Sequence, residues 1–518
     1  MLPAGLDSTI KDTFSYLQHS REEYIPAFKP VETGKVTGLS PGIARVSGLP
    51  GAGYSELLKF PGNLYGIAFQ LNEEEIGVVL LGDTQQLRTG DEVKRTGRVM
   101  DVPVGDALTG RIINPLGDPL DGKGPVAFSN RMPVERPAPP IMSRAPVTEP
   151  LQTGIKIIDA LVPVGRGQRQ LIMGDRQTGK TSIAVDTILN QRGKNIICIY
   201  CAIGQRASSV AKVMARLNEN QAMQYTIILV AEGNDAPGLQ YIAPYAATSI
   251  AEYFMEHGKD VLIIYDDLTQ HARAYRELSL LLRRPPGREA FPGDIFYIHS
   301  RLLERATHLA ENLGGGSLTA LPVIETEAQN ISAYIPTNLI SITDGQIYLS
   351  PKLFELGVLP AVDAGKSVSR VGGKAQLPAY RAATGNLKLA YAQFTELETF
   401  ARFGTRLDDN TKTIIEHGKR IRESFKQAEL QPVPVIEQMI VLLALTAGLF
   451  DNIPLHKMRQ AEALLRKAIG LIPAVVTNRL LSKDLLNDAD KKVIIDIAFQ
   501  TLNSFSQSLS QSKVEADE

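Results

Sequence analysis

The chain has 518 residues, of which 44% are apolar and 21% charged, and its formal net charge is -1. This composition is typical of a folded globular protein, and the length predicts about three domains. With this charge balance the protein has no overall positive charge with which to bind nucleic acid or an anionic membrane. Binding through local basic patches is still compatible with the composition. The longest apolar run, residues 439–450, is shorter than the roughly 20 residues that span a bilayer as a helix, and predicts a buried helix.

Residues 1–31 are predicted to form an N-terminal arm. Ile10, Phe14 and Leu17 follow a short amphipathic pattern, which favours either docking onto another protein or folding back on the same polypeptide. Acidic residues occur early and an apolar signal core is missing. The segment therefore predicts a protein that stays in the compartment where it is made.

Residues 32–100 contain short β-type runs separated by glycines, at 35–38, 43–48, 64–69 and 76–81. Several short strands with turn signals at close spacing predict a small barrel or sandwich, and we expect a β-barrel. Its aromatic residues do not alternate with basic ones, which favours a structural barrel over a platform on which nucleic-acid bases stack.

Residues 101–377 are predicted to form an α/β domain. A loop-rich entry, residues 101–150, precedes strands and helices that alternate along the sequence. Three continuous apolar runs, at 196–200, 226–230 and 261–265, are typical of strands buried on both faces. They predict a parallel sheet covered by helices.

A phosphate-binding motif of the form G-x-x-x-x-G-K-[ST] lies between an apolar run at 171–173 and a helical pattern at 182–189. Its residues, with the serine that follows, are Gly174, Asp175, Arg176, Gln177, Thr178, Gly179, Lys180, Thr181 and Ser182. Glycines let backbone N–H groups surround phosphate oxygens, and the helix start adds the positive end of a dipole. Lys180 is expected to reach the outer phosphates and Thr181 to bind Mg²⁺. The motif predicts a bound nucleotide together with Mg²⁺.

Asp266 follows the apolar run at 261–265 directly. A carboxylate at the carboxyl end of such a strand, downstream of a phosphate-binding loop, is positioned to hold Mg²⁺, for Asp266 through water. A strand-end aspartate on its own is more often a helix-cap or turn residue. Asp267 is the weaker candidate for the metal role.

Cys198 and Cys201 form a C-x-x-C pattern, which can indicate redox chemistry or zinc. They lie in a β-type run, where residues three apart point to opposite faces of a sheet. We therefore expect two buried core thiols, in keeping with a reducing compartment.

Residues 378–518 are predicted to be helical. Leu387, Ala390, Tyr391 and Phe394 have the helical i, i+3, i+4, i+7 spacing. We expect an α-helical bundle that ends in a Ser/Gln-rich, poorly ordered tail after Ser504.

The order of barrel, P-loop domain and helical domain resembles the major subunits of rotary ATPases, which implies a RecA-like central domain. Local sequences resemble the alpha subunits of F-type ATP synthases over nearly the whole sequence. These segments are residues 152–156, 174–181, 283–290, 334–338, 341–345 and 367–372.

The resemblance implies that three such subunits alternate with three β subunits around a γ stalk, and that the β subunits make and hydrolyse ATP coupled to H⁺ or Na⁺ transport. Each alpha subunit would hold Mg-ATP or ADP at a non-catalytic site and be inactive alone. The N-terminal arm would contact the δ/b peripheral stalk. The complex would lie on the cytoplasmic face of the bacterial inner membrane, bound only indirectly through the Fo sector, with no nucleic-acid partner.

Four further residues gain roles from the resemblance. Gln205 ends the strand after the P-loop helix, at a position where the catalytic β subunit has a glutamate. A neutral amide cannot act as a general base. Some GTPases, however, position the attacking water with a glutamine. Arg370 would be an arginine finger that reaches the neighbouring β subunit, and Ser341 would lie at the same interface. Gln427 would contact the nucleotide. The ordinary alternatives are a strand-end polar residue for Gln205 and a solvated charge for Arg370.

Three positions depart from the family pattern and suggest a divergent bacterial branch. Lys366 replaces an apolar residue, Leu359 an arginine near the adenine, and Glu429 a second glutamine that faces the base. The adenine pocket is thus less conventional than the phosphate pocket. The alternatives are a self-sufficient hexameric P-loop ATPase, either a secretion motor, which predicts turnover by this polypeptide alone, or an RNA translocase, which predicts salt-sensitive RNA binding.

Overall fold

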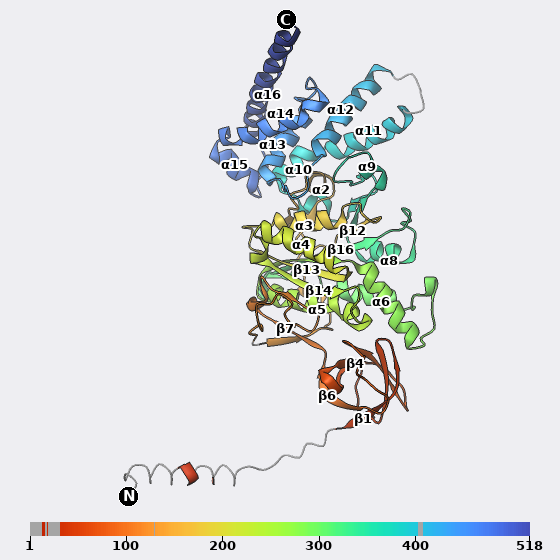
Figure 1. Ribbon diagram of the computed structural model, residues 1–518. Coiled ribbons are helices and arrows are strands. Elements are labelled where there is room, and N and C mark those ends of the chain that lie inside the picture. Colours follow the sequence, from red (N-terminus) through yellow and green to blue (C-terminus); the bar gives the residue numbers. More distant parts are fainter. Residues whose placement is uncertain (1–12, 16–17, 19–31, 129, 402–407, 518) are drawn as a thin grey trace, which may run out of the picture.

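The computed structural model describes residues 13–15, 18, 32–128, 130–401 and 408–517. Ile10 and Leu17 of the predicted arm lie outside these ranges. A barrel, a central α/β domain and a helical domain follow one another along the molecule (Figure 1). The three-part architecture predicted from the sequence is therefore confirmed.

The N-terminal domain is a closed barrel of six antiparallel strands in the order β1-β2-β5-β4-β3-β6. The strands are β1 (Thr33–Ser40), β2 (Ile43–Ser47), β3 (Glu56–Lys59), β4 (Tyr65–Leu71), β5 (Ile76–Leu80) and β6 (Glu92–Val99). Alternate residues such as Val36, Val46 and Leu58 point inward and form a separate apolar core. Closure leaves no free sheet edge.

Short elements connect the barrel to the central domain. They are β7 (Asp101–Val104), β8 (Ile112–Ile113), β9 (Asn130–Pro133), β10 (Pro150–Leu151), α2 (Lys156–Leu161) and β11 (Val164–Gly165). β7 pairs with β9 and β10 with β11, whereas β8 joins the main sheet beside β14.

The central domain is built on an eight-stranded sheet in the order β18-β17-β12-β16-β15-β13-β14-β8. The further strands are β12 (Leu171–Gly174), β13 (Ile196–Gln205), β14 (Thr226–Glu232), β15 (Asp260–Asp266), β16 (Ser317–Glu325), β17 (Gly345–Leu349) and β18 (Val368–Ser369). All neighbours are parallel except β17 and β18. The parallel strands therefore share one carboxyl end, where loops can form a ligand site.

Helices cover both faces of this sheet (Figure 1). One face carries α3 (Lys180–Leu189) and α4 (Ala207–Glu219). The other carries α5 (Pro237–Glu256), α6 (Leu268–Leu281), α7 (Ile295–Leu303) and α8 (Tyr334–Ile342). Cys198 packs in the first core and Cys201 in the second, and both are buried free thiols. The prediction that they point to opposite faces is confirmed.

In the described residues of the C-terminal domain, the regular secondary structure is helical. After the short α9 (Pro351–Glu355), which belongs to the central domain, it comprises α10 (Pro378–Thr384), α11 (Leu387–Ala401), α12 (Asp409–Phe425), α13 (Val435–Thr446), α14 (Met458–Lys467), α15 (Ala474–Leu481) and α16 (Asp488–Asp517). α13 contains most of the long apolar run and is buried from Gln438 to Leu445. Among the described residues, no helix has the length and apolarity required to cross a membrane.

The backbone after Ser504, where a poorly ordered tail was expected, is helical as far as Asp517, and the degree of order of this tail stays a prediction. The apolar spacing of Ile494, Ala498 and Leu502, all buried, anchors α16 on the bundle. Helix formation is cooperative, so an anchored segment can extend into a polar sequence without a new nucleus.

Buried polar contacts join the central and helical domains. Lys156 of α2 lies 2.5 Å from Glu462 of α14, with the lysine side chain 2% exposed. Asp159 accepts hydrogen bonds from Thr153 and from Gln438 of α13. Removal of one partner would leave an unpaired polar group in the interior, so these contacts hold the two domains in a fixed arrangement.

Candidate functional site

The phosphate-binding loop links the carboxyl end of β12 to the first turn of α3. Gly179 has a φ of 97°, which L side chains rarely adopt, and it directly precedes the helix. A Cβ at Gly174 would lie 2.9 Å from both Leu349 and Thr178. Gly179 is thus required by its backbone conformation, and Gly174 is required because a side chain there would collide with its neighbours. The loop leaves backbone donors at the helix start, where an anion is favoured.

Lys180 is buried at the base of this loop. Its Nζ donates to the carbonyl oxygens of Gly174 at 2.9 Å and Asp175 at 2.7 Å. Burial lowers the pKa of Lys180, and the nearby carboxylates of Glu325 and Asp267 oppose that shift. The loop therefore holds the Lys180 ammonium group in place. There its positive charge would balance the negative charge of bound phosphates.

Asp175 and Arg176 brace the loop from outside. The Asp175 carboxylate accepts hydrogen bonds from the Thr326 hydroxyl and, at 3.1 Å, from the backbone N–H of Gln329. Arg176 donates to Glu325 at 3.1 Å with a largely exposed side chain. These two side chains connect the loop to the end of the neighbouring strand β16, and leave the backbone amides to face an anion.

Asp266, at the end of β15, lies directly beside Thr181. The Thr181 hydroxyl donates to Asp266 Oδ2 at 2.8 Å, and the Tyr200 hydroxyl donates to the same oxygen at 2.7 Å. Gln205, at the end of β13, donates its amide to Oδ1 at 3.1 Å. Three hydrogen bonds fix the carboxylate, so its orientation is set before any ligand arrives.

The adjacent aspartates have different surroundings. Asp267 caps α6 by accepting from the N–H of Gln270 at 2.8 Å, so the helix-cap interpretation holds for Asp267. Burial raises the pKa of both aspartates, that of Asp267 to about 7 with the Asp266 charge adding to the shift. Hydrogen bonds from Tyr200 and Thr181 oppose the rise at Asp266.

The donor set fits magnesium. Mg²⁺ prefers oxygen ligands and usually binds through one or two protein groups together with phosphates and water. The Thr181 hydroxyl and the Asp266 carboxylate, 2.8 Å apart, supply oxygen donors of this type next to the helix start. The pair is thus suited to a magnesium ion that also contacts a phosphate group.

On the opposite side of α3, the loop between α12 and α13 packs against the helix. Gln427 accepts from the N–H of Lys156 at 3.1 Å, and its amide donates to the carbonyls of Gly154 and Gln431 at 2.8 and 2.9 Å. Its backbone N–H donates to the Leu359 carbonyl at 2.9 Å. These contacts hold the loop against the central domain, and the expected contact of Gln427 with nucleotide stays a prediction.

The departures from the family pattern fall in two places. Leu359 lies beside Gln427, 39% exposed, and Glu429 accepts a hydrogen bond from Ser182. Both positions therefore lie near the P-loop helix. Lys366 is exposed and its Nζ lies over the ring of Tyr348.

Arg370 and Ser341 lie together, away from the phosphate loop. Both are exposed, and the Arg370 guanidinium donates to the carbonyl of Ile340 at 3.2 Å. The Arg370 N–H donates to the Asp344 carbonyl, directly before β17. β17 runs parallel to β12 and pairs Leu349 with Gly174 at its other end. Arg370 is thus at the amino end of the parallel strands, and the P-loop is at the carboxyl end.

The separation follows from strand geometry. The Asp344 N–H donates to the carbonyl of Arg169, at 2.8 Å, and Gly174 is five residues further along the same extended segment. At about 3.3 Å per residue, the two ends are roughly 16 Å apart. An arginine side chain does not cover that distance, so Arg370 does not serve the phosphate loop of its own subunit.

A network of ion pairs holds the backbone under Arg370. Arg169 forms a bidentate pair with Asp344, with Nε–Oδ2 and NH2–Oδ1 distances of 3.0 and 2.9 Å, and also donates to Glu304. Arg144 reaches Glu304 at 3.1 Å. Bidentate arginine–carboxylate geometry is strong and directional. The network makes the amino end of the sheet a rigid surface.

Two groups in the site were absent from the sequence-based prediction. Tyr200 points its hydroxyl at Asp266, and Glu325 ends β16 close to Arg176. Glu325 had a readable signal, because it follows an apolar run just as Asp266 does. Tyr200 had none, since a tyrosine within an apolar strand is ordinarily a core residue.

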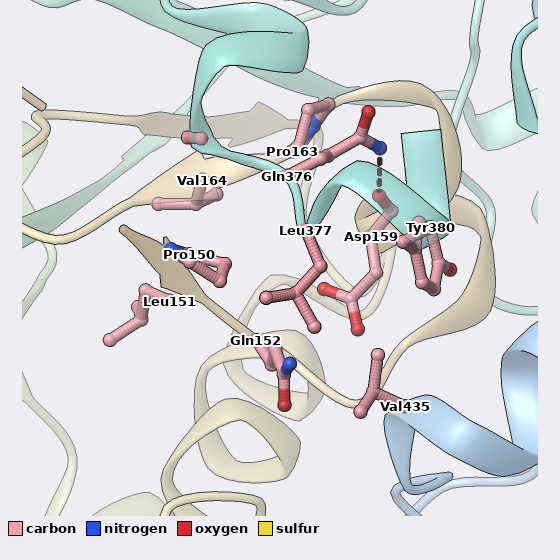
Figure 2. Close-up of a pocket in the computed structure, with 11 residues that line it drawn as sticks. Pro150, Leu151, Gln152, Asp159, Pro163, Val164, Gln376, Leu377, Tyr380 and Val435 are labelled. Atoms are coloured by element: carbon pink, nitrogen blue, oxygen red, sulfur yellow. Dashed lines mark hydrogen bonds between the residues drawn. The ribbon is translucent and has the colours of Figure 1, made fainter. Parts of the chain in front are cut away.

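A separate small pocket lies where the central and helical domains meet (Figure 2). Its lining includes Leu151, Asp159, Leu377 and Tyr380, and Gln376 donates to the Asp159 carbonyl at 2.8 Å. Burial raises the pKa of Asp159, although four hydrogen bonds stabilise its charge. The pocket contains none of the phosphate-loop residues. It belongs to the domain junction.

Three family models match the sequence. Residues 31–97 match the beta-barrel domain of the ATP synthase alpha/beta family, residues 154–369 match the nucleotide-binding domain of that family, and residues 376–501 match its C-terminal domain. The three matched ranges correspond to the barrel, the sheet domain with the P-loop, and the helical domain.

Relatives of similar length share most residues with this protein. It is 69% identical over 506 residues to ATP synthase subunit alpha 2 of Albidiferax ferrireducens, covering 98% of the present sequence and 95% of that protein. It is 66% identical over 514 residues to ATP synthase subunit alpha 1 of Shewanella frigidimarina, covering 99% of each. A Marinomonas protein, ATP synthase subunit alpha 1, is 70% identical over 493 residues, covering 95% of the present sequence and 97% of that protein.

Proposed function

Since the chain belongs to the ATP synthase alpha/beta family, among the alpha subunits of the F-type enzyme, we propose that its own nucleotide site is non-catalytic and that it contributes Arg370 to a catalytic site on a neighbouring β subunit. The bound ligand is Mg-ATP or Mg-ADP. The subunit acts in ATP synthesis and hydrolysis as part of the assembled complex and is inactive alone.

The observation that carries this proposal is the placement of the two candidate groups at opposite ends of one sheet. The phosphate loop follows β12 at its carboxyl end, and Arg370 is bound to Asp344 at the amino end. An exposed arginine remote from its own phosphate site is suited to stabilising charge on a nucleotide held by another subunit.

The surroundings of Gln205 support a non-catalytic site. Its amide donates to Asp266, so the side chain orients the carboxylate beside Thr181 and cannot accept a proton from water. A magnesium ion held by Thr181 and Asp266 would neutralise phosphate charge. In this arrangement Lys180, Thr181 and the loop amides bind the nucleotide.

The proposal includes the assembly. Three copies alternate with three β subunits around γ. The N-terminal arm, largely outside the described residues, would contact the δ/b stalk. The complex would be peripheral on the cytoplasmic face of the bacterial inner membrane, with H⁺ or Na⁺ as the coupled ion.

The proposal is tested by purifying the full-length subunit with and without its β partner. We expect nucleotide binding in both preparations and turnover only with β. In the complex, Arg370→Ala should lower turnover by about 10³- to 10⁵-fold, the range known for arginine fingers, while nucleotide binding to this subunit is retained. Lys374→Ala, an exposed cation in the same loop, is the matched control and should be nearly neutral.

Two results would contradict the proposal. Robust turnover by the subunit alone would favour the self-sufficient ATPase, and near-normal activity of the Arg370→Ala complex would remove the arginine from catalysis.

A further inference from the structure

Glu429 places a carboxylate directly on the P-loop helix. The Ser182 hydroxyl donates to Glu429 Oε1 at 2.8 Å. Arg216 of α4 contacts Glu429 Oε2 at 3.3 Å, and the Glu429 side chain is half exposed. One acidic group is thus shared between the first turn of α3 and the neighbouring helix.

This contact lies next to the phosphate donors. Ser182 immediately follows Thr181 and is two residues from Lys180, so its hydroxyl belongs to the same helix start that gathers donors for an anion. A nucleotide bound at Lys180 brings several negative charges to this turn. The Ser182 hydroxyl then donates to Glu429 and not to a phosphate. The negative charge of Glu429 also has the same sign as that of the ligand, so the two repel each other.

Other contacts hold Glu429 in place. Asp186, one turn further along α3, accepts the N–H of Leu430 at 2.8 Å. On the other side, Gln427 is bound to Gly154 and Leu359. The segment on both sides of Glu429 is therefore anchored to the central domain.

We propose that Glu429 sets the charge selectivity of this nucleotide site. Its carboxylate competes with the ligand phosphates for Ser182, so the site discriminates against metal-free nucleotide and favours nucleotide whose charge Mg²⁺ has partly neutralised. This inference rests on the proposed phosphate site, and it concerns affinity and selectivity, not the arginine function at the other end of the sheet.

The test measures equilibrium binding of ATP to the full-length subunit, with Mg²⁺ and with EDTA. Glu429→Gln keeps an oxygen that accepts from Ser182 and removes the charge. We expect metal-free ATP to bind on the order of tenfold more tightly, about 1.4 kcal/mol, and Mg-ATP to gain less. The difference between variant and wild type should shrink as salt rises, because repulsion near the surface is screened. Glu219→Gln removes an exposed charge from α4 and should change neither affinity.

A second variant removes the same charge in another way. Glu429→Ala deletes the carboxylate that contacts Ser182 and Arg216, so metal-free ATP should again bind more tightly than it does to wild type, while Mg-ATP changes less. If Glu429→Gln does not fold, an unchanged affinity of Glu429→Ala for metal-free ATP would overturn the inference.

The outcomes separate this inference from the proposed function. If wild type binds no nucleotide, or if Lys180→Ala binds nucleotide as well as wild type does, the proposed phosphate site is overturned. Normal wild-type binding with no change in the magnesium dependence of Glu429→Gln would overturn only the role of Glu429. A changed preference between ATP and GTP, with magnesium dependence unaltered, would mean that Glu429 contacts the base and would likewise refute charge selection.

Discussion

The Asp186→Asn substitution is expected to stabilise the protein at neutral pH. Asp186 is 6% exposed on α3, and its carboxylate accepts the N–H of Leu430 at 2.8 Å. Burial raises the pKa of Asp186 from 3.8 to about 6, with the Glu429 charge adding to the rise. Asparagine keeps an acceptor oxygen for Leu430 and removes the charge that burial disfavours.

The sign and size follow from the linkage of protonation to folding. Because the folded-state pKa of Asp186 lies above its unfolded value, ionisation lowers the free energy of unfolding as pH rises from about 4 to about 6. A shift of roughly two pKa units corresponds to about 3 kcal/mol at most. The variant should therefore match wild type near pH 4 and exceed its free energy of unfolding by up to that amount above pH 6.

Urea denaturation of the two proteins at a series of pH values between 4 and 8 measures this difference. Asp409→Asn, at an exposed position on α12, removes the same charge from a solvated site and should have little effect at any pH. An Asp186→Asn protein that is less stable than wild type at pH 8, or a gain that is equal at pH 4.5 and pH 8, would refute the reasoning.

Two further substitutions test contacts at the two ends of the sheet. Gln205→Glu brings a second carboxylate against Asp266, in place of an amide donor 3.1 Å away; we expect a melting temperature lower by several degrees, restored by Mg-nucleotide, as measured by thermal denaturation with and without Mg²⁺. A melting temperature that is lower by the same amount with Mg-nucleotide would contradict this. Asp344→Asn weakens the bidentate pair with Arg169 and should lower turnover of the assembled complex about tenfold through displacement of Arg370, with nucleotide binding to the subunit unchanged. Unchanged turnover would show that Arg370 is positioned without this pair.

The local features of the phosphate loop were predictable because they are encoded in consecutive residues. Gly179, Lys180 and Thr181 follow a strand and open a helix, and the structure has them in that arrangement. Asp266 was also predictable, since a buried apolar strand that ends in a carboxylate places that group at the edge of a parallel sheet.

The order of the strands was not predictable in the same way. β17 is short and β18 has two residues, so neither carries a clear periodic signal. Their pairing places Arg370 at the amino end of the sheet, and pairing depends on contacts between residues far apart in the sequence. The residues around Arg370 indicate no role on their own, and the role proposed for it comes from the family resemblance.

Gln427 illustrates a second limit of sequence-based prediction. Its expected contact with nucleotide stays a prediction, and its amide bonds with the backbone of residues about 270 positions away, which the residue type does not indicate. Whether a glutamine points its amide at a ligand or at a carbonyl depends on the loop conformation, which the residue type does not determine. The same holds for Tyr200 and its bond to Asp266.

The common direction of the parallel strands gives each subunit a polarity. One end of the sheet carries the phosphate-binding loop, and in the proposed function the other end presents Arg370 to phosphates bound by a neighbouring subunit. Contacts between unlike ends are heterologous, and such head-to-tail contacts either close into a ring or continue as a filament. In a closed ring of subunits that all point the same way, each end that carries an arginine faces an end that binds phosphate. Closing the ring would therefore place an arginine opposite every phosphate-binding end.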